Sequence, residues 1–299
     1  MTPEARRAAG RGALAAGLCY FLWGLVPLYW TRLAAINPVE LIAHRLVWSL
    51  VFLLAVIALR ADGGFGAVRD ALGSLRAIGL NLLSASLLTV NWLVYVWSVN
   101  TGHVIECSLG YFLVPLVNVG LGRLVLHERL RPAQWAAIAC AALGVAQQVV
   151  QLGHPPLIAL TLAATFGTYG LLRKKSALGP LTGLTVETAL LTPLALGFLL
   201  WQHYTGAGAL GRVDTASHLL VLSAGVVTSV PLLLFAYGAR RVRLSTLGLL
   251  QYIAPTVQFA LGVWFYREAF SPQRAASFAF IWCGLALYTA DNLWAQRRR

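Results

Sequence analysis

Charged side chains are rare in the apolar stretches of this chain, so the few that occur there are the first candidates for chemistry. Arg45 lies about eight residues inside an apolar segment, and its guanidinium must face a polar interior or reach back to the surface. His44 precedes it and shares a helical face with Glu40. Glu187 is followed by 24 uncharged residues, and a desolvated carboxylate there could carry a proton. We expect Arg45, His44 and Glu187 to contact a solute or a coupling ion. The alternatives are an interhelical hydrogen bond or a shallower position for Glu187, and a helix-capping role for Glu40.

Three further apolar segments carry polar and aromatic side chains three or four residues apart. Such residues share one face of a helix, and a proline within the helix frees a carbonyl group and permits a kink. We expect these helices to line an aromatic, weakly polar substrate cavity, with helix–helix packing as the alternative. The predicted lining residues are Asn91, Trp92, Tyr95, Tyr111, Asn118, Gln251, Tyr252 and Gln258, and the two prolines are Pro115 and Pro255.

Motifs for covalent catalysis, nucleotide binding and metal binding are absent from the sequence. It contains no Gly-x4-Gly-Lys-Ser/Thr loop, no His-Glu-x-x-His and no Gly-x-Ser-x-Gly. No two of its four cysteines lie within four residues of each other. We therefore expect no cofactor, no metal site, no catalytic residue and no enzymatic activity.

The composition identifies the environment that must hold these residues. The chain has 299 residues, of which 59% are hydrophobic and 11% charged, and its mean hydropathy is +0.72. Soluble domains have roughly 45–50% apolar and about 25% charged residues, so this chain is expected to be an integral membrane protein. Its 23 basic and 10 acidic residues give a net charge of +13. The basic residues lie in short clusters between apolar stretches, which favours membrane orientation over binding to nucleic acid.

The gaps between charged residues predict an all-α fold of transmembrane helices. A helix needs about 20 mostly apolar residues to cross roughly 30 Å of hydrocarbon. The uncharged run 132–172 is interrupted by Gly153-His154-Pro155-Pro156 and therefore holds two helices. Ten helices are predicted, at 11–30, 39–59, 77–98, 105–126, 133–150, 156–173, 181–201, 217–238, 245–266 and 274–294.

Basic residues alternate between the two sides of this arrangement. One set of termini and loops carries six clusters of three basic residues, and the other set carries four basic residues in all. Under the positive-inside rule, this asymmetry predicts a multi-pass protein with both termini in the cytoplasm. The six clusters are Arg6, Arg7 and Arg11; Arg60, Arg69 and Arg76; Arg123, Arg129 and Arg131; Arg173, Lys174 and Lys175; Arg240, Arg241 and Arg243; and Arg297, Arg298 and Arg299.

An internal repeat divides the chain into two halves of five helices, 1–151 and 152–299. Pro255 follows Pro115, and Glu268 follows Glu128, by the same number of residues. We call this spacing the repeat offset, and a second pair of prolines is matched at the same spacing. An odd number of helices inverts the second copy, and inverted repeats are a known construction of secondary transporters, with the substrate site between the copies. For Glu128 and Glu268 we expect a structural role, tying a loop or compensating a helix N-terminus.

The repeated Pro-x12-Glu-x3-Pro-x11-Gly pattern resembles the drug/metabolite transporter superfamily with its EamA-type repeats. Several motifs resemble the RarD branch more specifically. The resemblance implies a bacterial inner-membrane permease, in a branch linked to chloramphenicol sensitivity. The motifs are Asn91-Trp92, Glu106-Cys107-Ser108-Leu109-Gly110-Tyr111-Phe112, Arg173-Lys174-Lys175, Arg243-Leu244-Ser245-Thr246-Leu247-Gly248, Gln251-Tyr252-Ile253 and Ala279-Phe280-Ile281-Trp282.

Together these features predict a secondary-active or facilitative transporter that moves a small metabolite or drug-like solute by alternating access. The expected partners are the solute and the lipid bilayer. A coupling proton or counter-solute and a homodimer are open alternatives. The competing functions are a lipid flippase and a channel-like membrane protein.

Overall fold

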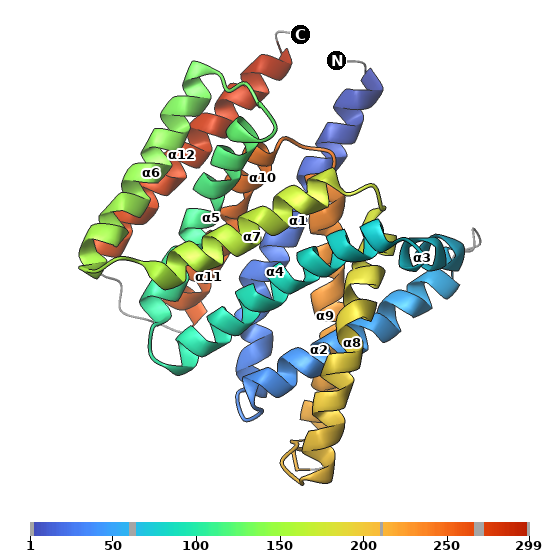
Figure 1. Ribbon diagram of the computed structural model, residues 1–299. Coiled ribbons are helices and arrows are strands. Elements are labelled where there is room, and N and C mark those ends of the chain that lie inside the picture. The colour runs from blue at the N-terminus through green and yellow to red at the C-terminus, as the bar shows by residue number, and fades with distance from the viewer. Residues whose placement is uncertain (1–2, 60–63, 210–211, 266–271, 298–299) are drawn as a thin grey trace.

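The computed structural model describes residues 3–59, 64–209, 212–265 and 272–297, and in these ranges the regular structure is helical (Figure 1). Most of the helices are long. Their order is α1 (Pro3–Trp30), η1 (Thr31–Leu33), α2 (Pro38–Ala58), α3 (Phe65–Leu72), α4 (Leu75–Asn100), α5 (Val104–Leu124), α6 (Pro132–Leu152), α7 (Leu157–Lys175), α8 (Pro180–Tyr204), α9 (Thr215–Ala239), α10 (Leu244–Gln251), α11 (Ile253–Ala260), η2 (Leu261–Phe265) and α12 (Pro272–Arg297).

Local sequence signals explain where several of these helices begin and end. The Asn37 side chain accepts a hydrogen bond from the amide of Val39 at the start of α2, and Pro38 occupies the first helical position. Proline also opens α6, α8 and α12. Gly153 ends α6 with a φ of 75°, a conformation that glycine adopts at little cost. The Gly-His-Pro-Pro turn therefore separates α6 from α7, as the sequence predicts.

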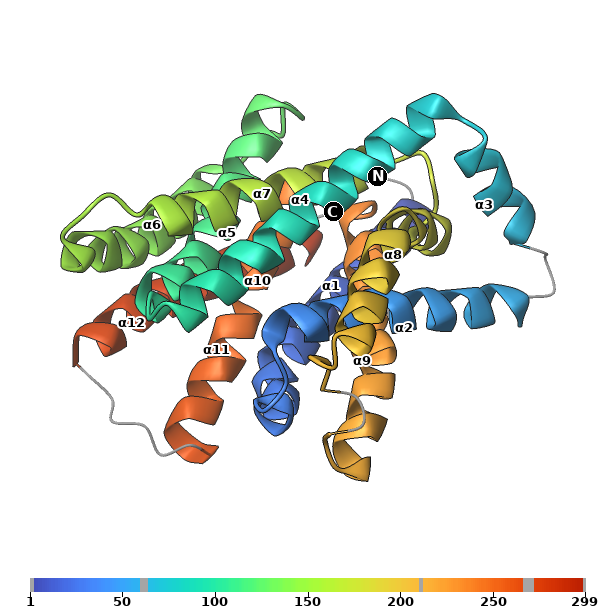
Figure 2. The same ribbon diagram turned by 60° about the horizontal axis from the view of Figure 1, so that its bottom comes forward.

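Three elements differ from the predicted helices. The segment 60–76, expected to be a loop, contains the short helix α3, which lies at the edge of the bundle (Figure 2) and contacts α4 and α8. α1 begins at Pro3, eight residues before the predicted start. The predicted helix 245–266 is divided into α10, α11 and the π-helical turn η2.

Pro255 accounts for the division between α10 and α11. A proline inside a helix has no amide hydrogen to donate, and its ring collides with the carbonyl group four residues earlier. For Pro255 that residue is Gln251, where α10 ends. Pro115, its counterpart in α5, leaves that helix continuous from Val104 to Leu124. The two halves of the chain thus differ at this matched proline.

Eight helical segments within the described residues have the length and apolar composition needed to cross a membrane. They are α1, α2, α4, α5, α6, α8, α9 and the run from Leu244 to Phe265. In α12 the apolar part is shorter, from Ala275 to Asp291, and α7 ends in three basic residues. The described chain is therefore a multi-span helical membrane protein, and ten spans remain a prediction.

Helices distant in the sequence pack together to form the bundle. α6 lies along α12, α5 packs on α7 and α10, and α1 packs on α9, α10 and α11. α2 packs on α8 and α9, and α4 packs on α7 and α8. The first turns of α1 and the last turns of α12 lie at the same end of the bundle, together with the α5–α6 and α9–α10 connections (Figure 1).

The outer surface of the bundle carries many large apolar side chains. Leu14, Leu124 and Leu194 are each 75% exposed. A soluble monomer rarely shows such continuous apolar surface, whereas a helix facing lipid requires it. The interior instead holds buried polar residues, including Asn91, Asn118 and Glu187.

Candidate functional site

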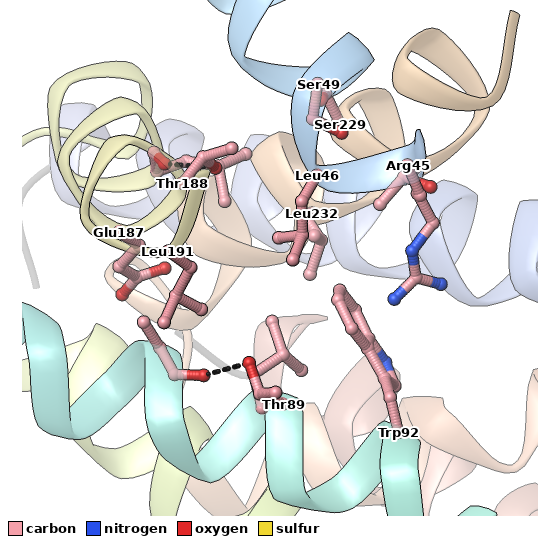
Figure 3. Close-up of a pocket in the computed structure, with 14 residues that line it drawn as sticks. Arg45, Leu46, Ser49, Thr89, Trp92, Glu187, Thr188, Leu191, Ser229 and Leu232 are labelled. Atoms are coloured by element: carbon pink, nitrogen blue, oxygen red, sulfur yellow. Dashed lines mark hydrogen bonds between the residues drawn. The ribbon is translucent and has the colours of Figure 1, made fainter. Parts of the chain in front are cut away.

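A small cavity lies between α2, α4, α8 and α9, near the middle of these helices (Figure 3). The space open to the centre of a water molecule is about 20 Å³, and roughly 10–15 Å³ is enough for one water. This conformation therefore has room for water but not for an organic solute. The lining residues are Arg45, Leu46, Ser49, Ala85, Leu88, Thr89, Trp92, Leu184, Glu187, Thr188, Leu191, Thr228, Ser229 and Leu232.

Arg45 reaches one end of the cavity from α2. Its Cζ atom lies 3.2 Å from the centroid of a Trp92 ring, so the guanidinium covers the indole face (Figure 3). Nε and Nη2 of Arg45 are buried and have no hydrogen-bond partner among the described residues. The structure therefore brings together two residues that were predicted separately, and two donor atoms of Arg45 face no acceptor of the described residues.

Glu187 lies on the α8 wall and is held by an ion pair. Arg173 Nη1 lies 3.1 Å from Glu187 Oε1, and the two side chains are 1% and 3% exposed. Tyr169 donates a longer hydrogen bond, of 3.5 Å, to Glu187 Oε2. The sequence places Arg173 in a basic loop cluster, but it lies inside the bundle in the last turn of α7. Glu187, which the sequence places inside an apolar segment, is buried, and its partner Arg173 was not identified from the sequence.

The structure brings Arg45, Trp92 and Glu187 to the cavity and places the other predicted residues in contacts between helices. Asn91 Nδ2 donates to Leu162 O and to Thr165 Oγ1, both at 2.9 Å, joining α4 to α7.

Tyr95 is 42% exposed and packs its ring 5.8 Å from that of Tyr111. These contacts correspond to the packing alternative given for the set.

The remaining predicted residues also lie away from the cavity lining. Buried His44 places Nε2 3.7 Å from Glu40 Oε1. Asn118 is 1% exposed and faces glycines of α7 and α10. Tyr252 donates to the carbonyl oxygen of Phe112 at 3.2 Å. Buried Gln251 lies beside Tyr252, and Gln258 Nε2 donates to Trp23 O at 3.4 Å.

The hydroxyl groups that complete the cavity were not predicted from the sequence. Thr228 and Ser229 of α9 line it, and their buried hydroxyls have no hydrogen-bond partner in the described part of the chain. Ser229 is the counterpart of Thr89 at the repeat offset, and both line the cavity. This pair could have been identified from the sequence if the comparison at the repeat offset had included the helices that precede residues 115–144.

Three other carboxylates bind backbone amides of distant segments. Glu40, in the first turn of α2, accepts from Ala209 N at 2.8 Å through Oε1 and so holds the segment that follows α8. Glu106 Oε1 accepts from Ile158 N at 2.8 Å, at the start of α7. Glu128 Oε1 and Oε2 accept from Leu244 N and Ser245 N at 2.6 and 3.1 Å, at the start of α10.

Negative side chains at helix N-termini are stabilising. The structural role expected for Glu128 is therefore observed, at the start of a distant helix. Glu268, its predicted counterpart, lies outside the described residues.

Within those residues, no group of three or more His, Cys, Asp or Glu side chains could hold a metal ion. The charged groups at the cavity are Arg45 and Glu187, and the rest of the lining is aliphatic, aromatic or hydroxylic. A lining of this kind is typical of sites for small, largely apolar solutes, although the present volume admits only water.

Comparisons with known proteins identify the family. The EamA-like transporter family model matches residues 10–147 and 155–290. A Streptomyces exfoliatus protein named RarD is 47% identical over 280 residues, which cover 93% of this chain and 88% of that protein. A Vibrio cholerae protein described as an uncharacterized transporter is 43% identical over 293 residues, covering 98% and 96%.

A crystal structure of another protein, 22% identical, superposes with a TM-score of 0.70 and covers 93% of this chain and 97% of its own. It shares the fold. Both relatives are bacterial, and the matched family and the Vibrio cholerae relative are described as transporters. With its apolar spans, the chain belongs to the EamA-like transporter family, as a bacterial inner-membrane protein similar to RarD.

Proposed function

We propose that this protein is a secondary transporter built from two inverted five-helix halves, residues 1–151 and 152–299. A small solute binds in the cavity between the halves, and alternating access moves it across the membrane. Both termini then lie in the cytoplasm, as the basic clusters predict. The observation that carries this proposal is a set of reciprocal contacts between residues that the repeat offset relates.

The pair α6 and α12 gives the clearest reciprocal contact. A methyl group added to Gly144 would lie 2.7 Å from Ser277 O, and one added to Gly284 would lie 2.5 Å from Ala137 O. Gly284 is the counterpart of Gly144 at the repeat offset, and Ser277 is the counterpart of Ala137. Each glycine therefore meets the same position of the other helix, which a two-fold axis between α6 and α12 requires.

A second reciprocal contact joins other helices. A methyl group on Gly167 of α7 would lie 2.6 Å from Val117 Cγ1, and one on Gly24 of α1 would lie 2.5 Å from Val257 Cβ. Val257 follows Val117 by the repeat offset, whereas the separation between Gly24 and Gly167 is slightly longer than that offset. The same relation therefore extends from α6 and α12 to α1, α5, α7 and α11.

The cavity itself follows the relation. Trp92 and Leu232 both line the cavity, and the repeat offset relates them. Arg45 and Glu187 also both line it, and their separation along the chain is slightly longer than the repeat offset. Inverted-repeat transporters bind substrate at the interface between their repeats. Drug-sized solutes need pockets of about 300–1,000 Å³, so the 20 Å³ cavity must widen before a solute enters. The present conformation is then a contracted state of the transport cycle.

The direct test combines discovery of a solute with measurement of its flux. Efflux from a deletion strain and from its complemented parent is profiled without a prior choice of compound. Each enriched solute is then assayed for counterflow in liposomes that contain the purified protein. Saturable counterflow supports alternating access, whereas binding without flux, or unitary conductance, contradicts it. Conductance would favour a channel, and lipid transfer would favour a flippase.

Two variants test the site within this assay. Arg45→Ala and Glu187→Gln are expected to lower counterflow at least tenfold while the protein still inserts into the membrane. Arg69→Gln on exposed α3 is the control, because Arg69 is 88% exposed. Flux that follows a pH gradient would identify a coupling proton, and flux that requires solute on both sides would identify an exchanger. Wild-type rates in both site variants would remove Arg45 and Glu187 from the transport path.

The inverted topology has an independent test. Single cysteines at positions 127 and 268, placed in a cysteine-free background, are labelled from each side of the membrane with an impermeant maleimide. The proposal requires labelling from opposite sides. Labelling of both positions from one side would refute the inverted repeat.

A further inference from the structure

The guanidinium of Arg45 has its Nε and Nη2 atoms buried, and no carboxylate of the described residues pairs with it. It lies seven residues after Pro38, about 10 Å along α2. Its Nε and Nη2 atoms have no hydrogen-bond partner in the ranges that the structure describes, and Trp92 covers one face of the group. Burying a charge is costly unless a partner compensates it. A group that completes this arrangement must therefore be an acceptor, and an anion suits it best.

The protein's own buried carboxylates are already engaged. Glu187 pairs with Arg173 at 3.1 Å, and Glu40 accepts the amide of Ala209 at 2.8 Å. Glu106 accepts the amide of Ile158 at the same distance. No side chain lining the cavity other than Glu187 is acidic. With Glu187 neutralised by Arg173, the cavity carries a net charge of about +1, located on Arg45.

The rest of the cavity has a distinct character. Leucines of α2, α4, α8 and α9, together with Ala85, form an aliphatic wall. Thr228 and Ser229 add hydroxyls that are buried and lack partners among the described residues. Thr89 and Thr188 instead donate to carbonyl groups of their own helices. The open polar positions are therefore one cation and two hydroxyls against an apolar wall.

We propose that the solute is an organic monocarboxylate with an apolar body, whose carboxylate binds Arg45. This inference rests on the proposed function, since it names the substrate class of the same cavity. A guanidinium matches a carboxylate with parallel N–H···O bonds and charge-assisted strength. The leucine-rich wall holds the apolar body, and the Thr228 and Ser229 hydroxyls bind a polar substituent.

The same charges disfavour two related classes of solute. An amino acid brings an ammonium group, but Glu187, the only carboxylate at the cavity within the described chain, is paired with Arg173. A phosphate ester brings about two negative charges, but Arg45 is the single cation among the lining residues. A monocarboxylate therefore binds more tightly than its α-amino acid or its neutral amide.

The test uses two matched sets of probes with the purified full-length protein in detergent. One set is 3-phenylpropanoate, 3-phenylpropanamide and L-phenylalanine; the other is 4-methylpentanoate, 4-methylpentanamide and L-leucine. Thermal unfolding is measured against probe concentration at constant pH and ionic strength. At least one carboxylate is expected to raise the Tm saturably, with its amide and amino acid at least about 30-fold weaker. Absence of stabilisation by both carboxylates, or an equal effect of an amide or amino acid, overturns the proposal.

Variants of Arg45 assign the effect to the cavity. Arg45→Gln is expected to abolish stabilisation by the carboxylate, and Arg45→Lys to retain part of it as a point charge. Because no carboxylate in the described part of the chain pairs with Arg45, Arg45→Gln is expected to leave the Tm without ligand unchanged or raised. The proposal is overturned if Arg45→Gln lowers the Tm without ligand and Arg45→Lys binds the carboxylate as tightly as the wild type does. These two results together would show that Arg45 has an internal partner. Arg69→Gln is the control, expected to bind as the wild type does.

The outcomes separate this inference from the proposed function. Carboxylate binding that depends on Arg45, without counterflow in liposomes, supports the inference and contradicts transport. Counterflow of neutral or cationic solutes, with no Arg45-dependent binding of carboxylates, supports transport and overturns the inference.

Discussion

The buried ion pair between Arg173 and Glu187 gives a prediction whose size follows from the structure. The two charged atoms are 3.1 Å apart, and the side chains are 1% and 3% exposed. At an effective dielectric constant near 20, unit charges at that distance attract by about 5 kcal/mol. Removing one partner of such a pair typically costs about 3–5 kcal/mol, because the other charge stays buried without compensation.

A double-mutant cycle isolates this interaction. Glu187→Gln is expected to lower the free energy of unfolding by about 3–5 kcal/mol, since it leaves Arg173 as an unpaired buried cation. Arg173→Met is expected to be similarly destabilising. The double variant Arg173→Met/Glu187→Gln removes both charges and is expected to be more stable than either single variant.

The assay is reversible unfolding by sodium dodecyl sulfate in mixed micelles, followed by circular dichroism. The matched control is Arg69→Gln, because Arg69 and Asp70 form an exposed ion pair at 4.0 Å, with exposures of 88% and 77%. Exposed pairs contribute little, so no measurable change is expected. The reasoning is refuted if the double variant loses the sum of the two single effects, since the charges would then not interact.

Two further predictions concern close contacts elsewhere in the bundle. Gly144→Ala and Gly284→Ala are each expected to lower stability by about 1–3 kcal/mol, because each methyl group would overlap a carbonyl oxygen of the facing helix. In the same unfolding assay Gly197→Ala is the control, since its methyl group would meet open space; equal stability of all three variants would contradict the α6–α12 crossing. Glu128→Ala is expected to cost about 1–3 kcal/mol by leaving amides at the start of α10 unpaired. Hydrogen exchange should then accelerate at Leu244, and unchanged exchange there would exclude the cap.

The helices could be predicted from the sequence because their cause is local. In a bilayer every backbone polar group must be bonded within the segment, so a long apolar run has to be helical. The starts of α2 and α8 lie within one residue of their predicted positions, since Pro38 and Pro180 mark them. Helix α3 was missed because its eight residues form only a short helix of mixed polarity, which carries no span signal.

The side of each helix that meets the cavity could not be predicted in the same way. A helix that is apolar all round has no distinct buried face, so polar residues at helical spacing do not indicate which side meets the cavity. Asn91 and Trp92 are adjacent in α4, yet Asn91 binds α7 and Trp92 lines the cavity. Thr228 and Ser229 were not predicted as cavity residues because hydroxyl residues occur throughout membrane helices.

The membrane environment, the positions of the long helices and the matched prolines and glycines could be read from the amino-acid sequence. These depend on composition and on spacing along one chain. The packing of the helices was needed to show that Arg173 neutralises Glu187 and that Glu128 caps the distant helix α10. It also showed that two donor atoms of Arg45, beside Trp92, have no acceptor among the described residues. Such pairings depend on how helices cross, and crossing is set by side-chain packing between segments far apart in the sequence.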